Sequence, residues 1–487
     1  MFYIKGRTVE EELDLDMRGI MNEKCALAAA INTANPASDV YKSLLLMENR
    51  GEAGVGIVSR KGNEFSQVRK VGSVSAQFNG YKEESFAKEL PGKIAFGHNR
   101  YATQGSPRSI GNVQPLIIEG SKYGPFAIAH NGQFVNIEKI KTELLKNGAI
   151  FQSTTDTELF AHLITNSGEA TIEKAIECAL EKIKTTYALL ILTQDKLFAI
   201  KDRYGVRPLS VAKLNNGYLV CSENYVFDNI PAVEFMYDIN PGEMVIFSKG
   251  KKAIQRKKYS EPDEHFCIFE AIYFSNPRSR CNGYYHEDFR IETGRQIAFE
   301  MRKAGIDVQA DYVIPILDSG KHAAWGLAEE LEIKYREFFQ RSHSYGILQV
   351  RSFTAATPAD REMIVEMKLN LRKDKIVGKI VIVVDDSVVR ATTIRKIVEK
   401  LIKAGAKKVI VCIASPPINS ICPSGMDYQD TKQLIAYDKT IEEIRDSIGA
   451  DELVYLSLDG LNQVVERTYN CGICSGCFGG KYPLKPQ

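Results

Sequence analysis

The chain has 487 residues, 44% of them hydrophobic and 25% charged, and its 63 basic and 61 acidic residues leave a formal net charge of +2. This length and composition are typical of two or three globular domains, which excludes a mini-protein scaffold and a disordered protein. The near-zero charge gives no electrostatic case for nucleic acid, and no run of about 18 uncharged apolar residues predicts a membrane helix.

The chain begins with an acidic segment that has little apolar periodicity. Its first 16 residues, MFYIKGRTVEEELDLD, lack the basic or apolar start of a secretory or transit signal, so we expect a cytoplasmic protein. We expect residues 1–24 to form an exposed leader outside any core.

Between residue 25 and about 262, short apolar runs typical of strands alternate with turn signals and a few helical stretches. The expected strands cover 125–130, 187–193, 196–200, 217–221 and 242–247, and the expected helices cover 38–50, 157–167 and 172–185. This pattern favours a layered α+β domain rich in antiparallel sheet. The polar stretch 248–265 is typical of a linker.

After the linker, strands and helices alternate. Strands are expected over 311–317, 379–386 and 407–414, and helices over 292–304, 322–331 and 393–404. Apolar strands bordered by amphipathic helices indicate a parallel sheet covered on both faces, that is, an α/β domain.

The sharpest chemical motif lies at the end of the strand 379–386. The apolar run Val381 to Val384 leads into the acidic pair Asp385 and Asp386, and a hydroxyl-rich loop, 387–393, then precedes a helix. Amides at a helix N-terminus bind anions, and two adjacent carboxylates accept sugar hydroxyls or hold Mg²⁺ through water. The motif therefore predicts a sugar-phosphate site, and its order of parts resembles the phosphoribosyltransferase signature. The alternative is a strand end followed by an ordinary Asp–Ser helix cap.

Four short polar motifs in the first half, 97–103, 112–115, 129–132 and 153–158, each begin or end an expected element. Each is weak alone, because an Asn-Gly pair such as Asn131-Gly132 is most often a turn. Together with Cys25 and the Asn49-Arg50-Gly51-Glu52 segment, these motifs resemble the class II glutamine amidotransferases, which are N-terminal-nucleophile glutaminases.

Joined to the phosphoribosyltransferase half, the chain from Cys25 to Tyr482 resembles the glutamine phosphoribosylpyrophosphate amidotransferase family, which begins purine biosynthesis. The resemblance implies an α+β N-terminal-nucleophile sandwich followed by an α/β type I phosphoribosyltransferase domain. It also implies four parts: a propeptide, a glutaminase domain, a transferase domain and a cysteine-rich tail, at 1–24, 25–262, 263–465 and 466–487.

For the glutaminase, the resemblance implies that removal of residues 1–24 makes Cys25 the first residue. The free α-amine of Cys25, with a reference pKa of about 8, would then take the thiol proton. By the same resemblance, the Asn131 side chain and the Gly132 amide form the oxyanion hole. The implied glutamine-binding residues are Arg100, Thr103 and Asp156.

For the transferase, the resemblance implies that Asp385 and Asp386 face the ribose and the Mg²⁺ of phosphoribosylpyrophosphate, with Ser319 as a further Mg²⁺ candidate. The implied 5′-phosphate loop consists of Ser387, Val388, Val389, Arg390, Ala391, Thr392 and Thr393. Ammonia freed at Cys25 would displace pyrophosphate to give phosphoribosylamine. Purine nucleotide inhibitors and a homotetramer are implied by the resemblance alone.

Several positions depart from the family pattern. Ala26-Leu27-Ala28-Ala29 replaces Gly-x-x-Gly, Ala391 replaces a glycine, Leu317 replaces a proline, and 340–354 differs from the family's flexible loop. If Ala391 has a positive φ, its strain is about 1 kcal/mol or more. These departures keep open an alternative, a paralogue with a glutaminase or regulatory ligand-binding role that has lost phosphoribosyl transfer.

Ten cysteines are too sparse for a disulfide scaffold, yet three of them crowd together near the end of the chain, which points to metal or redox chemistry. A subset of the resembled family carries a [4Fe-4S] cluster, and the resemblance implies the ligands Cys267, Cys422, Cys471 and Cys474, with Cys477 as an alternative to a neighbour. A zinc site would use the same set, and unliganded surface cysteines are the remaining alternative. We expect Cys178, Cys221, Cys281 and Cys412 to be structural.

Overall fold

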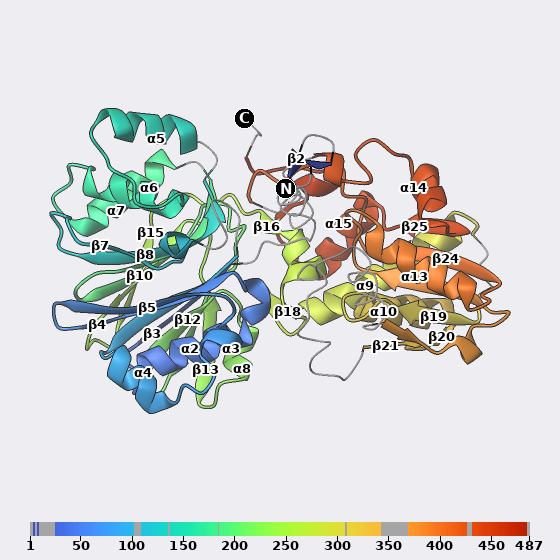
Figure 1. Cartoon of the computed structure of the whole chain (residues 1–487), viewed down its shortest axis with the longest axis horizontal. Helices are drawn as coiled ribbons and strands as arrows, with labels where there is room; N and C mark the ends of the chain where they lie inside the picture. The colour runs from blue at the N-terminus through green and yellow to red at the C-terminus, as the bar shows by residue number, and fades with distance from the viewer. Residues whose placement is uncertain are drawn as a thin grey trace.

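The structure is a computed structural model, and two units built around separate sheets lie side by side in it (Figure 1). It describes residues 3–4, 7–8, 25–101, 109–134, 137–183, 185–306, 309–341, 369–425 and 431–484. Of the expected leader, only β1 (Tyr3–Ile4) and β2 (Arg7–Thr8), an antiparallel pair, are described. Thr103 and most of the loop 340–354 lie outside the described residues.

The first unit contains two antiparallel sheets that pack face to face. The seven-stranded sheet has the order β13-β11-β12-β3-β6-β4-β5 and the six-stranded sheet the order β15-β14-β10-β9-β8-β7. The strands of the first sheet are β3 (Ala26–Ile31), β4 (Gly54–Lys61), β5 (Glu64–Val71), β6 (Ile94–Arg100), β11 (Ser210–Leu214), β12 (Gly217–Cys221) and β13 (Val233–Asp238). Those of the second are β7 (Leu116–Ile118), β8 (Phe126–Gln133), β9 (Thr186–Leu192), β10 (Lys196–Lys201), β14 (Glu243–Ser248) and β15 (Ile254–Lys258).

Helices cover the outer face of each sheet, which gives four layers (Figure 1). The seven-stranded sheet is covered by α2 (Pro36–Leu46), α3 (Val74–Gln77), α4 (Glu83–Glu89) and α8 (Tyr225–Asp228), and the six-stranded sheet by α5 (Ile137–Lys146), α6 (Asp156–Thr165) and α7 (Ile172–Lys182). The predicted α+β class is confirmed. The predicted linker 248–265 is partly wrong, because β15 lies within it; this edge strand is mostly exposed and so lacks an apolar pattern.

β3 is buried on both faces, which explains its run of small residues. Leu27, Ala29 and Ile31 face the opposing sheet, whereas Ala28 and Ala30 face the helical layer. The strand pairs with β6 over its whole length and with β12 from Ala28 to Ile31, so alanines in place of the family's glycines still form it.

The second unit has a five-stranded parallel sheet in the order β20-β19-β23-β24-β25, as predicted. The strands are β19 (Tyr312–Pro315), β20 (Lys334–Tyr335), β23 (Ile380–Asp385), β24 (Lys408–Ile413) and β25 (Glu452–Tyr455). Helices α9 (His286–Lys303), α10 (Lys321–Leu331) and α15 (Leu458–Arg467) cover one face, and α13 (Thr392–Lys403) and α14 (Ile441–Ile448) the other. A separate antiparallel pair, β21 (Phe339–Arg341) with β22 (Leu369–Leu371), packs on the core under α13.

β23 shows why the apolar run was a reliable signal. Ile382 and Val384 pack into the core under α9 and α10, and Val381 and Val383 pack into the core under α13. A strand covered on both faces is apolar at every position, as this run is.

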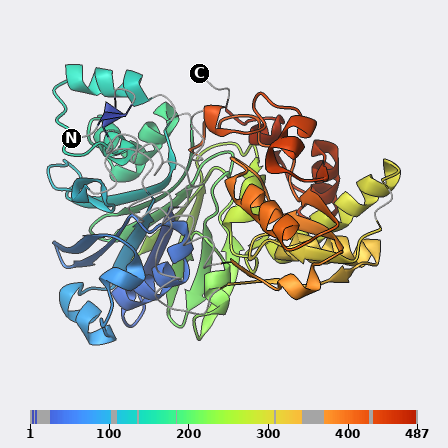
Figure 2. The same cartoon turned by 45° about the vertical axis from the view of Figure 1, so that its right-hand side comes forward.

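A junction of short elements connects the two units. β16 (Phe266–Cys267) leads into a π-helical turn, η3 (Glu270–Phe274), and a hairpin formed by β17 (Arg280–Cys281) and β18 (Tyr284–Tyr285). The end of the chain returns here, because β26 (Ile473–Cys474) pairs with β16 in parallel and is followed by η7 (Gly476–Phe478). Figures 1 and 2 both place the end of the described chain between the two units.

The expected tail at 466–487 begins inside α15, so this helix continues across the expected boundary. Among the described residues, no helix combines the length and apolar character that a membrane span requires.

Candidate active sites

Cys25 lies immediately before β3 and is partly buried. Its carbonyl oxygen accepts hydrogen bonds from the Asn131 side-chain amide, at 2.9 Å, and from Arg50 Nε, at 3.1 Å. Asn131 belongs to β8 of the opposing sheet. The sandwich therefore brings together Cys25 and Asn131, two of the residues predicted to act on glutamine.

Asn131 and Gly132 lie within β8 and form no turn there. Gly132 pairs with Tyr187 of β9 and has a φ of +147°, and a Cβ atom at Gly132 would stand 2.4 Å from the Thr186 carbonyl oxygen. Only glycine fits this close approach in this backbone conformation.

Arg100 lies beside Cys25, whereas Asp156 lies beside the end of β8, the strand that carries Asn131. Arg100 ends β6 and is buried; this burial lowers the pKa of its guanidinium, while the neighbouring Cys25 opposes the change. Asp156 begins α6, and its carboxylate accepts the Phe134 N–H at 3.0 Å just beyond β8. A guanidinium and a carboxylate suit the α-carboxylate and α-amino groups of an amino acid.

Arg50 is a site residue to which the motif analysis gave no role. It is fully buried behind Cys25, and its guanidinium hydrogen-bonds Glu223 at 2.7 Å and Glu270 at 2.8 and 3.0 Å. Glu270 belongs to η3 of the junction, so this side chain links the backbone of Cys25 to the start of the second unit.

A second constellation lies at the carboxyl edge of the parallel sheet. The Ser319 hydroxyl donates to Asp385 Oδ1 at 3.1 Å, the Asp386 N–H donates to the same oxygen at 3.0 Å, and the Ser387 hydroxyl donates to Asp386 Oδ2 at 2.6 Å. Burial and the adjacent Asp386 raise the pKa of Asp385 well above its usual range. The structure therefore brings the predicted Mg²⁺ residues together.

The loop that carries Ser319 packs closely on β23. A Cβ atom at Gly320 would stand 2.2 Å from the Val384 carbonyl oxygen, so a glycine is needed to place Ser319 beside Asp385. The Leu317–Asp318 peptide bond in this loop is cis.

The predicted phosphate loop offers backbone amides and hydroxyl groups. Val388 and Val389 bury their side chains in the cores on the two sides of the sheet, and Arg390 donates to Gln433 Oε1 at 2.6 Å. Ala391 has a φ of +60° directly before α13, and Thr392 and Thr393 are exposed in the first turn of this helix. The expected strain at Ala391 is thus present, and the loop ends at a helix N-terminus suited to an anion.

The cysteines gather in a different set from the one the sequence implied. Cys267 and Cys474 are register partners in the β16–β26 pair, both lie close to Cys422, and Tyr482 is close to these three thiols and to Cys477. The Cys477 carbonyl oxygen also accepts the Asn419 N–H at 3.1 Å, which joins the segments of Cys477 and Cys422.

Cys471 lies apart from this group and hydrogen-bonds Cys281 of β17. Because β26 starts at Ile473, Cys474 lies beside Cys267, whereas Cys471 precedes the strand and meets the β17–β18 hairpin. The four thiols that lie near Tyr482 are therefore Cys267, Cys422, Cys474 and Cys477. Within the described residues, no three or more His, Cys, Asp or Glu side chains converge closely enough to hold a single metal ion.

Comparison with known proteins identifies both domains. The family model "Glutamine amidotransferase domain" matches residues 98–229, and "Phosphoribosyl transferase domain" matches residues 286–446. The amidophosphoribosyltransferase of Bacillus subtilis (strain 168) is 37% identical over 469 residues, which cover 96% of this chain and 95% of that protein. The chain belongs to the amidophosphoribosyltransferase family.

Other amidophosphoribosyltransferases are similarly close. The chloroplastic protein of Vigna aconitifolia is 38% identical over 96% of this chain and 92% of its own. The solved B. subtilis glutamine phosphoribosylpyrophosphate amidotransferase, complexed with ADP and GMP, matches with a TM-score of 0.86 and 36% identity, covering 95% of this chain and 98% of that one. As an amidophosphoribosyltransferase, the chain transfers ammonia from glutamine to phosphoribosylpyrophosphate, the first step of purine biosynthesis.

Proposed function

We propose that Cys25 is the glutaminase nucleophile and that it acts as the first residue of the mature enzyme, after removal of residues 1–24. The meeting of Cys25 with Asn131 across the two facing sheets supports this assignment most strongly. The freed α-amine takes the thiol proton, and the thiolate attacks the side-chain amide carbon of glutamine. Ammonia leaves, and water then hydrolyses the thioester to give glutamate.

Asn131 and Gly132 stabilise the oxyanion of this step. The Asn131 Nδ2 group carries two hydrogens and uses one toward the Cys25 carbonyl oxygen, so a second remains for the oxyanion. Arg100 binds the α-carboxylate of glutamine and Asp156 its α-amino group. Thr103 assists them, as the family pattern implies.

The second site binds phosphoribosylpyrophosphate at the carboxyl edge of the parallel sheet. Asp385 and Asp386 bind the ribose hydroxyls, and residues 387–393 bind the 5′-phosphate through amides and hydroxyls at the start of α13. Ammonia attacks C1 of the ribose, and pyrophosphate leaves. The proposed limits of the two domains are 25–262, which contains the glutamine site, and 263–465, which contains the phosphoribosylpyrophosphate site.

Mg²⁺ suits this edge because two carboxylates and a hydroxyl meet there, and hard cations prefer oxygen ligands. Ser319, Asp385 and Asp386 would hold it. Bound there, Mg²⁺ would neutralise charge on the pyrophosphate group.

The cysteine group fits a [4Fe-4S] cluster held by Cys267, Cys422, Cys474 and Cys477. Four thiols from three segments of the chain lie around Tyr482 at the junction, and a multi-iron cluster accommodates thiols that do not converge on one ion. Burial raises the pKa of Cys474 to about 12, and a bound metal centre would reverse this change by stabilising the thiolate. The cluster would hold the returning end of the chain against β16.

Purine nucleotides are proposed inhibitors, and a homotetramer is the proposed assembly. The complex of the B. subtilis relative with ADP and GMP supports the nucleotide part of this proposal.

Pyrophosphate release from phosphoribosylpyrophosphate, measured with glutamine and separately with ammonium as the nitrogen donor, tests the two-site assignment. We expect Cys25→Ala to abolish the glutamine-dependent reaction and to spare the ammonium-dependent one. Asp385→Asn should abolish both. Loss of both activities in Cys25→Ala, with the protein still folded, would contradict separate sites.

A further inference from the structure

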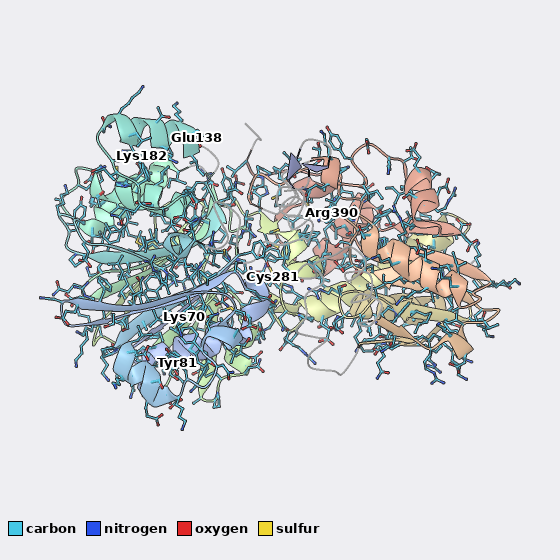
Figure 3. The ribbon with its side chains drawn as sticks, viewed as in Figure 1. Lys70, Tyr81, Glu138, Lys182, Cys281 and Arg390 are labelled. Carbon is cyan, nitrogen blue, oxygen red and sulfur yellow. The ribbon has the colours of Figure 1, made fainter. Side chains whose placement is uncertain are left out.

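Two thiols outside both active sites and outside the proposed cluster set touch each other at the junction. Cys281 in β17 and Cys471, just before β26, form a thiol–thiol hydrogen bond. Figure 3 labels Cys281, which lies between the two units. No local pattern pairs these two residues, since 189 others separate them along the chain.

Independent contacts hold the two segments together around this pair. The Asn282 side-chain amide donates to the Tyr469 carbonyl oxygen at 3.0 Å, and the Tyr469 hydroxyl lies 2.5 Å from His286 Nδ1. The Tyr284 and Tyr469 rings meet edge to face, with centroids 6.1 Å apart. The approach of Cys281 to Cys471 is therefore fixed by the packing on both sides of it.

Small molecules have a route to the pair. Cys281 lines a cavity of about 440 Å³ that also meets Lys201 and Glu264, and both cysteines are only partly buried. Partly exposed thiols beside a cation are the ones that oxidants reach and that react as thiolates.

Charge and hydrogen bonding give the two thiols different roles. The hydrogen bond from Cys281 lowers the pKa of Cys471 and, by the same contact, raises the pKa of Cys281, while Lys201 favours the thiolate at both. Cys471 is thus the thiol of the pair that loses its proton more readily, and Cys281 the one that keeps it.

We propose that Cys281 and Cys471 form a redox pair that closes to a disulfide when the protein meets a hydroperoxide and reopens with a thiol reductant. The Cys471 sulfur attacks the terminal peroxide oxygen, the O–O bond breaks, and an alcohol, or water from hydrogen peroxide, leaves. The resulting sulfenic acid is attacked by the Cys281 sulfur, and water leaves as the S–S bond forms. Two thiols and one hydroperoxide thus give one disulfide, one alcohol and one water.

The disulfide would tie the β17–β18 hairpin to the segment three residues before Cys474. The residues that follow Cys471 include Cys474 and Cys477, two of the proposed cluster ligands. The disulfide would therefore hold this part of the chain in place when oxidation removes the cluster. The proposal depends on the proposed cluster ligands in one respect: Cys471 must not be one of them.

The test uses the full, cluster-loaded protein. It is treated anaerobically with limiting hydrogen peroxide, its free thiols are blocked with N-ethylmaleimide, and it is digested without reductant for mass spectrometry. We expect a peptide containing Cys281 linked to one containing Cys471, lighter by two hydrogens than the separate peptides and lost on treatment with dithiothreitol.

Three variants accompany the wild type. Cys281→Ser and Cys471→Ser should each abolish the linked peptide and keep the iron content of the wild type, whereas Cys178→Ser, a partly buried thiol in α7, should keep both. Two results would overturn the redox pair alone. One is a wild type with its full iron content and no Cys281–Cys471 link, and the other is a Cys471 linked mainly to Cys474 or Cys477. Loss of iron in Cys471→Ser, but not in Cys477→Ser, overturns the proposed cluster set as well.

Discussion

Arg50 and Glu270 form a fully buried, two-pronged ion pair, with 2.8 and 3.0 Å between their guanidinium nitrogens and carboxylate oxygens. Arg50 also holds the Cys25 carbonyl oxygen, and Glu270 accepts the Ser275 hydroxyl at 2.8 Å in the junction. Arg290 holds the carbonyl oxygens of Ala271 and Ser275 at 2.8 Å each, on the side of the junction that faces the transferase site. A continuous chain of polar contacts therefore runs from the nucleophile segment to the second unit.

Glu270→Gln is expected to lower the free energy of unfolding by about 3 kcal/mol, because it leaves the Arg50 charge buried with Glu223 as its remaining ionic partner. Urea unfolding of the full chain measures this loss. Glu261→Gln, which breaks the exposed pair with Lys258, is the matched control and should change the unfolding free energy by less than about 0.5 kcal/mol. Equal effects of the two variants would remove the energetic role assigned to the buried pair.

The same carboxyl gives a pH dependence whose direction is fixed. Burial opposes ionisation of Glu270, but Arg50, Arg207 and Ser275 outweigh it and lower the pKa from 4.5 to about 2. Because the pKa is lower in the folded than in the unfolded chain, this stabilisation is complete above pH 4.5 and is lost as the pH falls toward 2. The difference between 4.5 and about 2 corresponds to roughly 3 kcal/mol.

Unfolding measured between pH 6 and pH 3 should therefore show the wild type approaching Glu270→Gln in stability below pH 4.5. Glu261→Gln should remain parallel to the wild type over the same range. A constant gap between wild type and Glu270→Gln down to pH 3 would mean that the carboxyl titrates normally.

Ala391→Gly is expected to leave stability unchanged or raise it by up to about 1 kcal/mol, since it removes a side chain from a left-handed residue with a φ of +60°. The same substitution at Ala404, which ends α13 with a φ of −80°, should instead cost about 0.5–1 kcal/mol. Thermal unfolding should thus show a lower midpoint than the wild type for Ala404→Gly but not for Ala391→Gly. A loss at both positions would show that Ala391 carries no strain.

Gly132→Ala is expected to lower the glutamine-dependent rate by about 100-fold or more, because the new Cβ would press on Thr186 and displace an oxyanion donor. The ammonium-dependent rate should stay at the wild-type level. Gly124→Ala is the control: it also changes a glycine of positive φ, two residues before β8, but no atom lies within 4 Å of the added carbon. Parallel loss of both activities in Gly132→Ala would instead indicate a folding defect.

Local patterns predicted the parts of this protein whose chemistry is contiguous in the chain. The run Val381 to Val384 predicts β23. The acidic pair that follows this run lies at the carboxyl end of the strand, as its position in the sequence predicts. Helix α9 begins at His286, earlier than the expected residue 292, because its first turn is rich in polar residues and carries no apolar stripe.

Contacts between residues far apart in the chain could not be predicted from the sequence. Arg50 and Glu270 are 220 positions apart, and nothing near either residue marks its partner. The spacing of Cys471, Cys474 and Cys477 places three thiols on one segment but does not say which way each one faces. The pairing of the two-residue strand β26 with β16 sets the direction of each thiol, and the sequence does not predict this pairing.

The pairing of β16 with β26 also joins two strands that are synthesised at very different times during translation. Phe266 and Cys267 are synthesised directly after the first unit, but their strand partners, Ile473 and Cys474, follow 207 positions later, after the strands of the parallel sheet. Nascent chains fold largely from the N-terminus onward, so the β16–β26 pair can form only after the second unit's parallel sheet has been synthesised. A chain cut before β26 would therefore contain both sheets of the first unit but leave β16 without its strand partner.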